Sequence, residues 1–346
     1  MSATSHLQYL DGWRGLAILF LLAGHFFPVP GINFGAIGVS LFFVLSGLLM
    51  SDLLFVRQVP LPQFYQRRIS RILPAALVFL CLIVGGRLLL GQRVAWNEVA
   101  AAALFVNNYT VGATGAEAMP FGHFWSLCVE EHSYILLSLL AIAARRHLAR
   151  AGTLVTAAAL AAGATGIIYC LLFKDTELRH LSMHSEMASF GILSSAALAL
   201  ALRGRNLPRL AAFACPPLLL LGIALHWWSM PPVLNHVMSV AAFALAINLL
   251  AAAPAALQTL LAALPLRQLG LWSFSIYVWQ QPFYLLSKYQ GMPAALGVTL
   301  ALGCGIASFY LVEQPSRTWL NRRFSRPQPA AATVAAPGIP AAGDAA

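Results

Sequence analysis

An arginine and a histidine stand eleven positions apart inside the first apolar stretch of the chain. Arg14 and His25 both lie in residues 10–29, LDGWRGLAILFLLAGHFFPV, which are long enough to cross a bilayer as a helix. At about 100° per residue, both side chains project from one helix face, about 16 Å apart. Because an arginine at membrane depth costs at least about 2.5 kcal/mol, this face indicates a polar cavity for a reaction or a transport event.

A second set of ionisable residues lies in the segment HFWSLCVEEHSY. His123 and Glu130 share a helix face about 10 Å apart, and Glu131 follows directly. Depth counted at about 1.5 Å per residue puts Glu130 at the level of His25. A carboxylate beside an imidazole fixes its tautomer, so we predict that Glu130 is the partner of His25 and that Glu131 meets a neighbouring helix. The alternative is that these groups only hold helices together, and for His123 the two interpretations are equally supported.

Three arginines, Arg67, Arg68 and Arg71, lie in PQFYQRRISRILP between the second and third apolar segments. We expect a short helical cytoplasmic segment there. Guanidinium groups suit phosphates, which predicts an anion site; the alternative is that the charges only set topology.

Three further candidates have simple structural interpretations. Asp11 precedes Arg14 by three positions and Glu313 precedes Arg317 by four, and each pair has the spacing of a routine helix ion pair. Trp125 has the character of an interface anchor.

The composition excludes a soluble globular protein, because 60% of the 346 residues are hydrophobic and 9% are charged. We predict an all-α, polytopic membrane bundle in residues 1–326 and a disordered Ala/Pro-rich cytoplasmic tail in residues 327–346. About ten transmembrane helices are expected, at 10–29, 35–55, 72–91, 123–143, 152–173, 185–202, 210–228, 233–253, 269–287 and 293–313.

The basic residues give this bundle an orientation. With the N-terminus in the cytoplasm, fifteen arginines fall in the inner loops and four basic residues in the outer loops. Both termini are therefore predicted to be cytoplasmic. The net charge of +10 reflects this topology, and we expect no nucleic-acid partner.

Six segments occur in an order that resembles the acyltransferase 3 family of polytopic membrane O-acyltransferases. They are YLDGWRGLAILFLLAGH, GAIGVSLFFVLSGLLM, FYQRRISRILP, HFWSLCVEEHSY, SFSIYVWQQP and VEQP, and they span Tyr9 to Pro315. The R-x10-H motif of the family matches Arg14 and His25, which implies that both are catalytic. The arginine cluster also matches, and VE-x-P matches Glu313 and Pro315.

The chain departs from the family pattern at two motifs. Many members have W-H-x-P where this chain has Trp279-Gln280-Gln281-Pro282, and often E-E-Q-F-Y where it has Glu130-Glu131-His132-Ser133-Tyr134. A proton role for the histidine of the first motif is therefore absent here. Some relatives carry a C-terminal SGNH hydrolase-like domain; we expect none in this chain, so the membrane domain would act alone or with a partner.

The resemblance implies a multi-pass protein of the bacterial inner membrane that moves an acyl group, most often acetyl, from cytoplasmic acyl-CoA to a hydroxyl of a glycan or glycolipid. His25 would be the general base or would carry the acyl group. Glu130 or Glu131 would orient it, Arg14 would hold the thioester or stabilise the oxyanion, and the arginine cluster would grip the CoA phosphates. No metal is expected. Membrane lipid and polysaccharide-assembly proteins are the expected partners, and the oligomeric state is left open.

Two rival functions explain part of the pattern. A transporter or flippase would also need intramembrane charges, but it predicts inverted repeats, and the sequence has no convincing internal symmetry. A structural or sensor subunit leaves the arginine, the histidine and the paired glutamates without a role.

Overall fold

The computed structural model describes residues 3–110, 120–206 and 209–324, and within these ranges the chain is helical. One backbone bridge, between Ile32 and Trp227, is the only strand-like pairing there. The α-helices are α1 (Ala3–Phe26), α2 (Phe34–Ser51), α3 (Leu61–Leu89), α4 (Trp96–Ala103), α5 (Trp125–Ala144), α6 (Leu148–Leu172), α7 (Asp175–Leu181), α8 (Ser185–Ala188), α9 (Phe190–Leu202), α10 (Cys215–Leu225), α11 (Ser239–Leu249), α12 (Ala255–Leu261), α13 (Leu264–Gln290), α14 (Ala294–Ser308) and α15 (Gln314–Phe324). The predicted all-α class is confirmed.

Short turns of other helix types join or extend these helices. The 3₁₀ turns are η2 (Asn107–Tyr109), η3 (Gly122–Phe124), η4 (Arg209–Phe213) and η6 (Leu250–Ala252), and the π-helical turns are η1 (Asp52–Val56), η5 (Leu234–Met238) and η7 (Phe309–Glu313).

Seven segments of the described chain are long and apolar enough to cross a membrane. They are Phe34–Val56, Leu61–Leu89, Gly122–Ala144, Leu148–Leu172, Ser185–Leu202, Leu234–Ala252 and Ala294–Arg323. Three predicted spans are not among them. Helices α1 and α13 are long but carry polar residues, and α10 has 11 residues, about 16 Å, against a hydrocarbon core of about 30 Å. The chain is a multi-pass membrane protein, and the count of ten remains a prediction.

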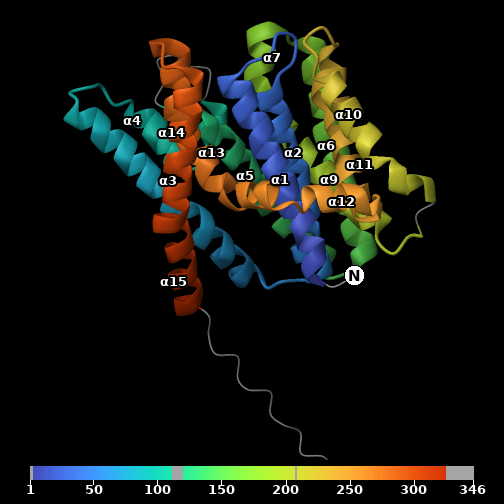
Figure 1. The fold of residues 1–346 in the computed structure, drawn as a ribbon. Coiled ribbons are helices and arrows are strands. Elements are labelled where there is room, and N and C mark those ends of the chain that lie inside the picture. The colour runs from blue at the N-terminus through green and yellow to red at the C-terminus, as the bar shows by residue number, and fades with distance from the viewer. Residues whose placement is uncertain (1–2, 111–119, 207–208, 325–346) are drawn as a thin grey trace, which may run out of the picture.

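The two ends of the described chain lie at the same end of the bundle: α1 begins there and α15 ends there (Figure 1). This arrangement fits an even number of crossings. Which side of the membrane this end faces stays a prediction, and the predicted tail at 327–346 lies outside the described residues.

Helices α1, α2 and α13 form the centre that positions the polar groups. Glycines let α1 and α13 approach backbone to backbone, as small residues do at membrane helix contacts. A Cβ added to Gly270 would lie 1.8 Å from the carbonyl oxygen of Asp11, and one added to Gly15 would lie 2.0 Å from that of Leu266. The relative position of the two helices is therefore fixed along this contact.

Helix α3 carries the arginine cluster on its first turns. It begins after Pro60 and continues past the internal Pro74 to Leu89, so the arginines belong to one long helix and not to a separate short segment. Helices α14 and α15 are joined by the π-helical turn η7 into one long column. Helix α15 lies beside the first part of α3 (Figure 1). Arginines from α3 and α15 are thereby brought to one end of the bundle.

Candidate active site

A cavity of about 500 Å³ lies between α1, α2, α3, α5, α13 and α15. Its apolar wall is formed largely by α2, α3 and α13. Six arginines line it: Arg14, Arg57, Arg67, Arg68, Arg71 and Arg317. Asp52 and Glu130 are the carboxylate residues in the same lining. Arginines outnumber carboxylates, so the cavity is suited to an anionic ligand.

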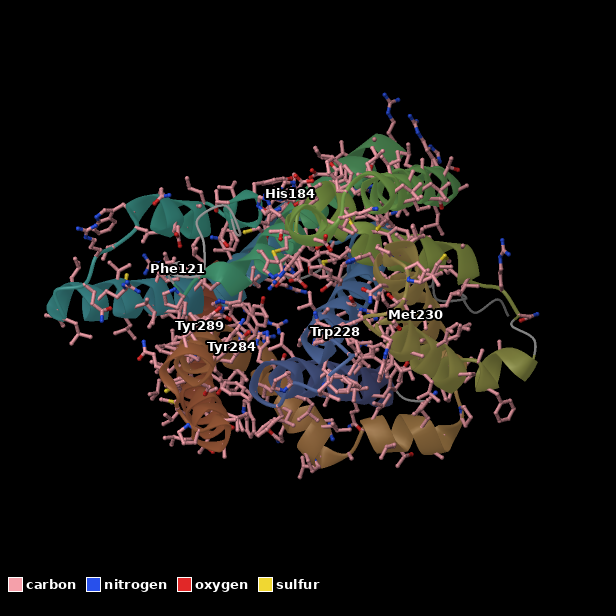
Figure 2. All side chains as sticks on the ribbon, turned by 90° about the horizontal axis from the view of Figure 1, so that it is seen from above. Phe121, His184, Trp228, Met230, Tyr284 and Tyr289 are labelled. Atoms are coloured by element: carbon pink, nitrogen blue, oxygen red, sulfur yellow. The ribbon has the colours of Figure 1, made fainter. Side chains whose placement is uncertain are left out.

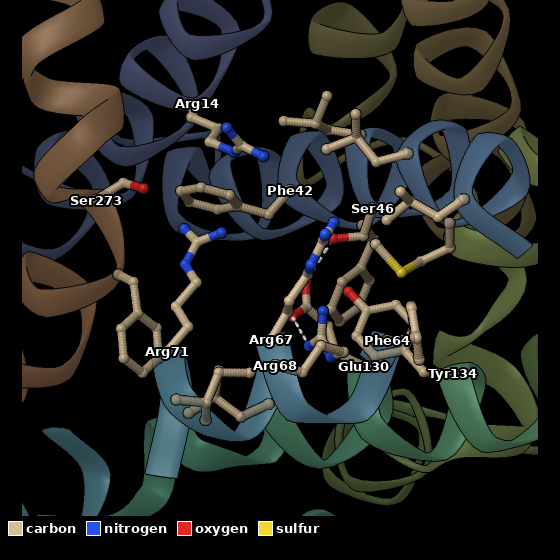
Figure 3. Close-up of a pocket in the computed structure, with 18 of the residues that line it drawn as sticks. Arg14, Phe42, Ser46, Phe64, Arg67, Arg68, Arg71, Glu130, Tyr134 and Ser273 are labelled. Atoms are coloured by element: carbon tan, nitrogen blue, oxygen red, sulfur yellow. Dashed lines mark hydrogen bonds and ion pairs between the residues drawn. The ribbon is translucent and has the colours of Figure 1, made fainter. Parts of the chain in front are cut away.

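Figure 3 shows how the arginines reach the cavity from different elements. Arg14 enters from α1, and Arg67 and Arg71 enter from α3, with the Phe42 ring of α2 between Arg14 and Arg71 in this view. Arg14 is also paired with Asp11 at 2.7 Å, which confirms the predicted helix ion pair. The arginines therefore reach the cavity from several helices, and α3 contributes both arginines and part of the apolar wall.

Arg68 is committed to protein partners. Its Nη2 lies 2.7 Å from Oε1 of Glu131 and 3.9 Å from Oε2 of Glu130, and its guanidinium carbon lies 3.7 Å from the centre of the Tyr134 ring. The prediction that Glu131 meets a neighbouring helix is confirmed, and that helix is α3. Arg68 therefore holds α3 against α5.

Arg67 and Arg317 make no ion pair within the described part of the chain. The predicted pair of Glu313 and Arg317 is not formed. Glu313 instead accepts a hydrogen bond of 2.7 Å from Ser275, and its Oε1 lies 3.8 Å from Nε of Arg71. Glu313 is buried and faces α13 and α3, so its carboxylate meets Ser275 and Arg71 and not the next turn of its own helix. Arg317 lines the cavity with its charge available.

His25 lies beyond the cavity and has its own environment. Its Nδ1 is 2.7 Å from Oε1 of Gln280, and its ring is stacked on Tyr284 with a centroid distance of 4.4 Å. Tyr277 lines the cavity and stands three residues before Gln280, about 4.5 Å along the axis of α13. Figure 2 shows Tyr284 next to Tyr289 on the face seen from above.

The predicted contact between Glu130 and His25 is not formed in the structure. Glu130 accepts a hydrogen bond of 2.7 Å from Ser46, whereas His25 lies against Gly35. Both Ser46 and Gly35 are on α2, about 16 Å apart along its axis. A depth counted from the ends of separate helices does not account for where α5 packs along α2, and here Glu130 packs at Ser46 and lines the cavity. Glu130 therefore belongs to the arginine-lined cavity.

Two other predicted residues lie in the packed interior. His123 belongs to the turn η3, before α5 begins, and its ring packs at about right angles to Phe79. It does not line the cavity that contains Glu130. Trp125 packs edge-on against Phe43 of α2, which is a role within the bundle. The structure thus brings Arg14, Glu130 and the arginine cluster together and leaves His123 and Trp125 apart from them.

Comparison with known proteins identifies the family of this chain. A model of the acyltransferase 3 family, described as an acyltransferase domain, matches residues 7–312. The chain belongs to this family.

OatA, named O-acetyltransferase, from Staphylococcus aureus strain NCTC 8325 / PS 47 is 28% identical over 153 residues, which are 40% of this chain and 25% of OatA. OatA of strain COL gives the same values. The chain thus aligns with about a quarter of the length of these relatives. No solved structure gives a significant match.

For this member of the acyltransferase 3 family, the structure adds residues that the sequence did not single out. Ser46 binds the part-buried Glu130, and Ser275 binds the buried Glu313. Arg317, expected from its spacing to pair with Glu313, lines the cavity instead. Gln280 was noticeable as a departure from a motif, but nothing in the sequence linked it to His25. The serines gave no signal, because isolated serines are common in membrane helices.

Proposed function

We propose that this protein is an O-acetyltransferase that moves an acetyl group from acetyl-CoA to a hydroxyl group of a glycan or glycolipid. The observation that carries the proposal is the arginine-lined cavity, whose lining includes Tyr277, about one helical turn from the partner of His25. Family membership and the name of OatA support acyl transfer and the choice of acetyl.

The donor would enter at the arginine end, which we assign to the cytoplasm of a bacterial inner membrane. Arg67, Arg71 and Arg317 would bind the CoA phosphates, since Arg68 is occupied by Glu131. Arg14 would hold the donor nearer its thioester end. The extended pantetheine arm would lie along the apolar wall formed by Phe42 and its neighbours.

His25 would act as the general base. Its Nε2 takes the proton from the acceptor hydroxyl, the hydroxyl oxygen attacks the thioester carbonyl carbon, and the carbon–sulfur bond breaks. The thiolate of CoA then takes the proton from the imidazolium, which restores His25. The acceptor would approach from the end of the bundle where Tyr284 and Tyr289 lie. Arg14 is about 16 Å along α1 from His25, so it serves the donor and not the oxyanion beside His25.

The test is release of CoA thiol from acetyl-CoA by the purified protein in nanodiscs made with lipid extract of the producing cells. We expect release above the rate of empty nanodiscs, and a loss of about 10²–10⁴-fold in His25→Ala. A transporter would release no thiol. A rapid acid quench with labelled acetyl-CoA tests the covalent route. Acetyl label retained on the protein would show that His25 carries the acetyl group as an acyl-imidazole and does not act as a general base.

A further inference from the structure

We propose that Gln280 is a positioning residue that holds His25 in the tautomer with the proton on Nδ1, so that Nε2 is the basic nitrogen. This inference rests on the proposed function, in which His25 accepts a proton. It concerns a residue at which the chain departs from the family pattern, and it gives that departure a chemical role.

The first observation is the burial and geometry of the pair. The Gln280 side chain has no exposed surface, and its Oε1 lies 2.7 Å from Nδ1 of His25. A buried glutamine without a partner would be costly, so this contact is a defined hydrogen bond.

The second observation sets the direction of that hydrogen bond. The Gln280 amide nitrogen donates to Oε1 of Gln281 at 3.3 Å, which turns the amide oxygen of Gln280 toward the histidine. An amide oxygen only accepts, so the proton must be on Nδ1 of His25. In the neutral ring, Nε2 then carries the lone pair.

The third observation concerns the space around Nε2. The neighbour on α2 is Gly35, and a Cβ added there would lie 3.4 Å from Nε2. The absence of a side chain at Gly35 keeps α2 from covering Nε2. Tyr284 covers one face of the ring, so the imidazole is held both in its plane and from the side.

A glutamine differs from a carboxylate in this position. It accepts the Nδ1 proton without adding a negative charge, and it cannot take that proton away. Gln280 therefore orients the ring without relaying protons, and the proton that His25 receives must return to a substrate atom.

The experiment compares three variants by the CoA-release assay across pH. Gln280→Leu removes the acceptor at similar volume, Gln280→Glu keeps an acceptor oxygen, and Gln290→Leu makes the same exchange at the exposed end of the same helix. We expect kcat to fall about 10²-fold or more in Gln280→Leu, with an unchanged KM for acetyl-CoA. In Gln280→Glu, kcat is largely kept. The pH at which activity increases should move upward, because an anion stabilises the imidazolium and neutral His25 then forms only at higher pH. Gln290→Leu should match the wild type.

Two results would overturn the inference: Gln280→Leu within twofold of the wild-type kcat, or Gln280→Glu as inactive as Gln280→Leu. ¹⁵N spectra of histidine-labelled protein give a readout independent of activity. The resonances missing from His25→Ala identify His25, and we expect protonated Nδ1 in the wild type and a mixed population in Gln280→Leu. If the wild type released no CoA, the proposed function would fail while these spectra still tested the tautomer.

Discussion

Oε1 of Glu131 accepts hydrogen bonds from both Nε and Nη2 of Arg68, at 3.3 and 2.7 Å. The same guanidinium covers the ring of Tyr134. Two adjacent arginines on α3 consequently have different tasks, because Arg67 has no such carboxylate partner in the described part of the chain. Arg68 holds two helices together, and Arg67 is available to a ligand.

Replacing these arginines separately should distinguish the two tasks. Arg68→Gln leaves the part-buried Glu131 without its cation, so its melting temperature in detergent should fall. Arg67→Gln should melt like the wild type and raise the KM for acetyl-CoA. If Arg68→Gln and Arg67→Gln had equal melting temperatures and equal losses of donor affinity, the two arginines would not have different tasks.

Glu130 should affect the donor and not the chemistry at His25. Glu130→Gln removes one negative charge from the arginine-lined cavity, so the KM for the anionic donor should fall while kcat stays within about twofold of the wild type. Ser46→Ala, which keeps the charge, is the matched control. The free-energy effects of Glu130→Gln and Gln280→Leu should add, as they do for sites more than about 10 Å apart. A large loss of kcat in Glu130→Gln would instead support the predicted pairing of Glu130 with His25 during catalysis.

Gly35 should be sensitive to side-chain size. Gly35→Val directs methyl groups toward Nε2 of His25 and should abolish most transfer, while Gly35→Ala, whose Cβ is at ordinary contact distance, should keep much of it. Gly86→Val is the control, since nothing lies within 4 Å of a Cβ there. Activity in Gly35→Val equal to that of Gly86→Val would show that the hydroxyl approaches His25 from another side.

Topology can be tested with reporter fusions. The distribution of basic residues predicts that fusions after Arg150 and after Arg205 report the cytoplasm and that a fusion after Lys174 reports the opposite side. The activities of a cytoplasmic and a periplasmic reporter enzyme, fused at the same position, show on which side of the membrane that position lies. A reversed pattern would place the arginine-lined cavity on the side that lacks acetyl-CoA.

The helical class and the arginine cluster were predictable because they depend on local pattern. Apolar length predicts helices, and the spacing of Asp11 and Arg14 predicts a helix ion pair that the structure contains at 2.7 Å. These inferences need no knowledge of how helices are arranged.

The partner of His25 was not predictable in this way. It depends on the depth at which α5 enters the bundle and on the contact between α1 and α13, and both are tertiary properties. The partners of the two carboxylates are tertiary as well, since Glu130 meets Ser46 of α2 and Glu313 meets Ser275 of α13. Such contacts between helices leave little trace in a single sequence.

The glycine contact between α1 and α13 has a consequence for turnover. His25 is on one of these helices and Gln280 is on the other, and Gly15 and Gly270 leave no room for either backbone to move closer or slide freely. The base and the group that aligns it are therefore carried by two helices in direct backbone contact. The imidazole is already oriented when the substrates arrive in each catalytic cycle. The conformational entropy of the His25 side chain is therefore lost when the chain folds, and not during each acetyl transfer.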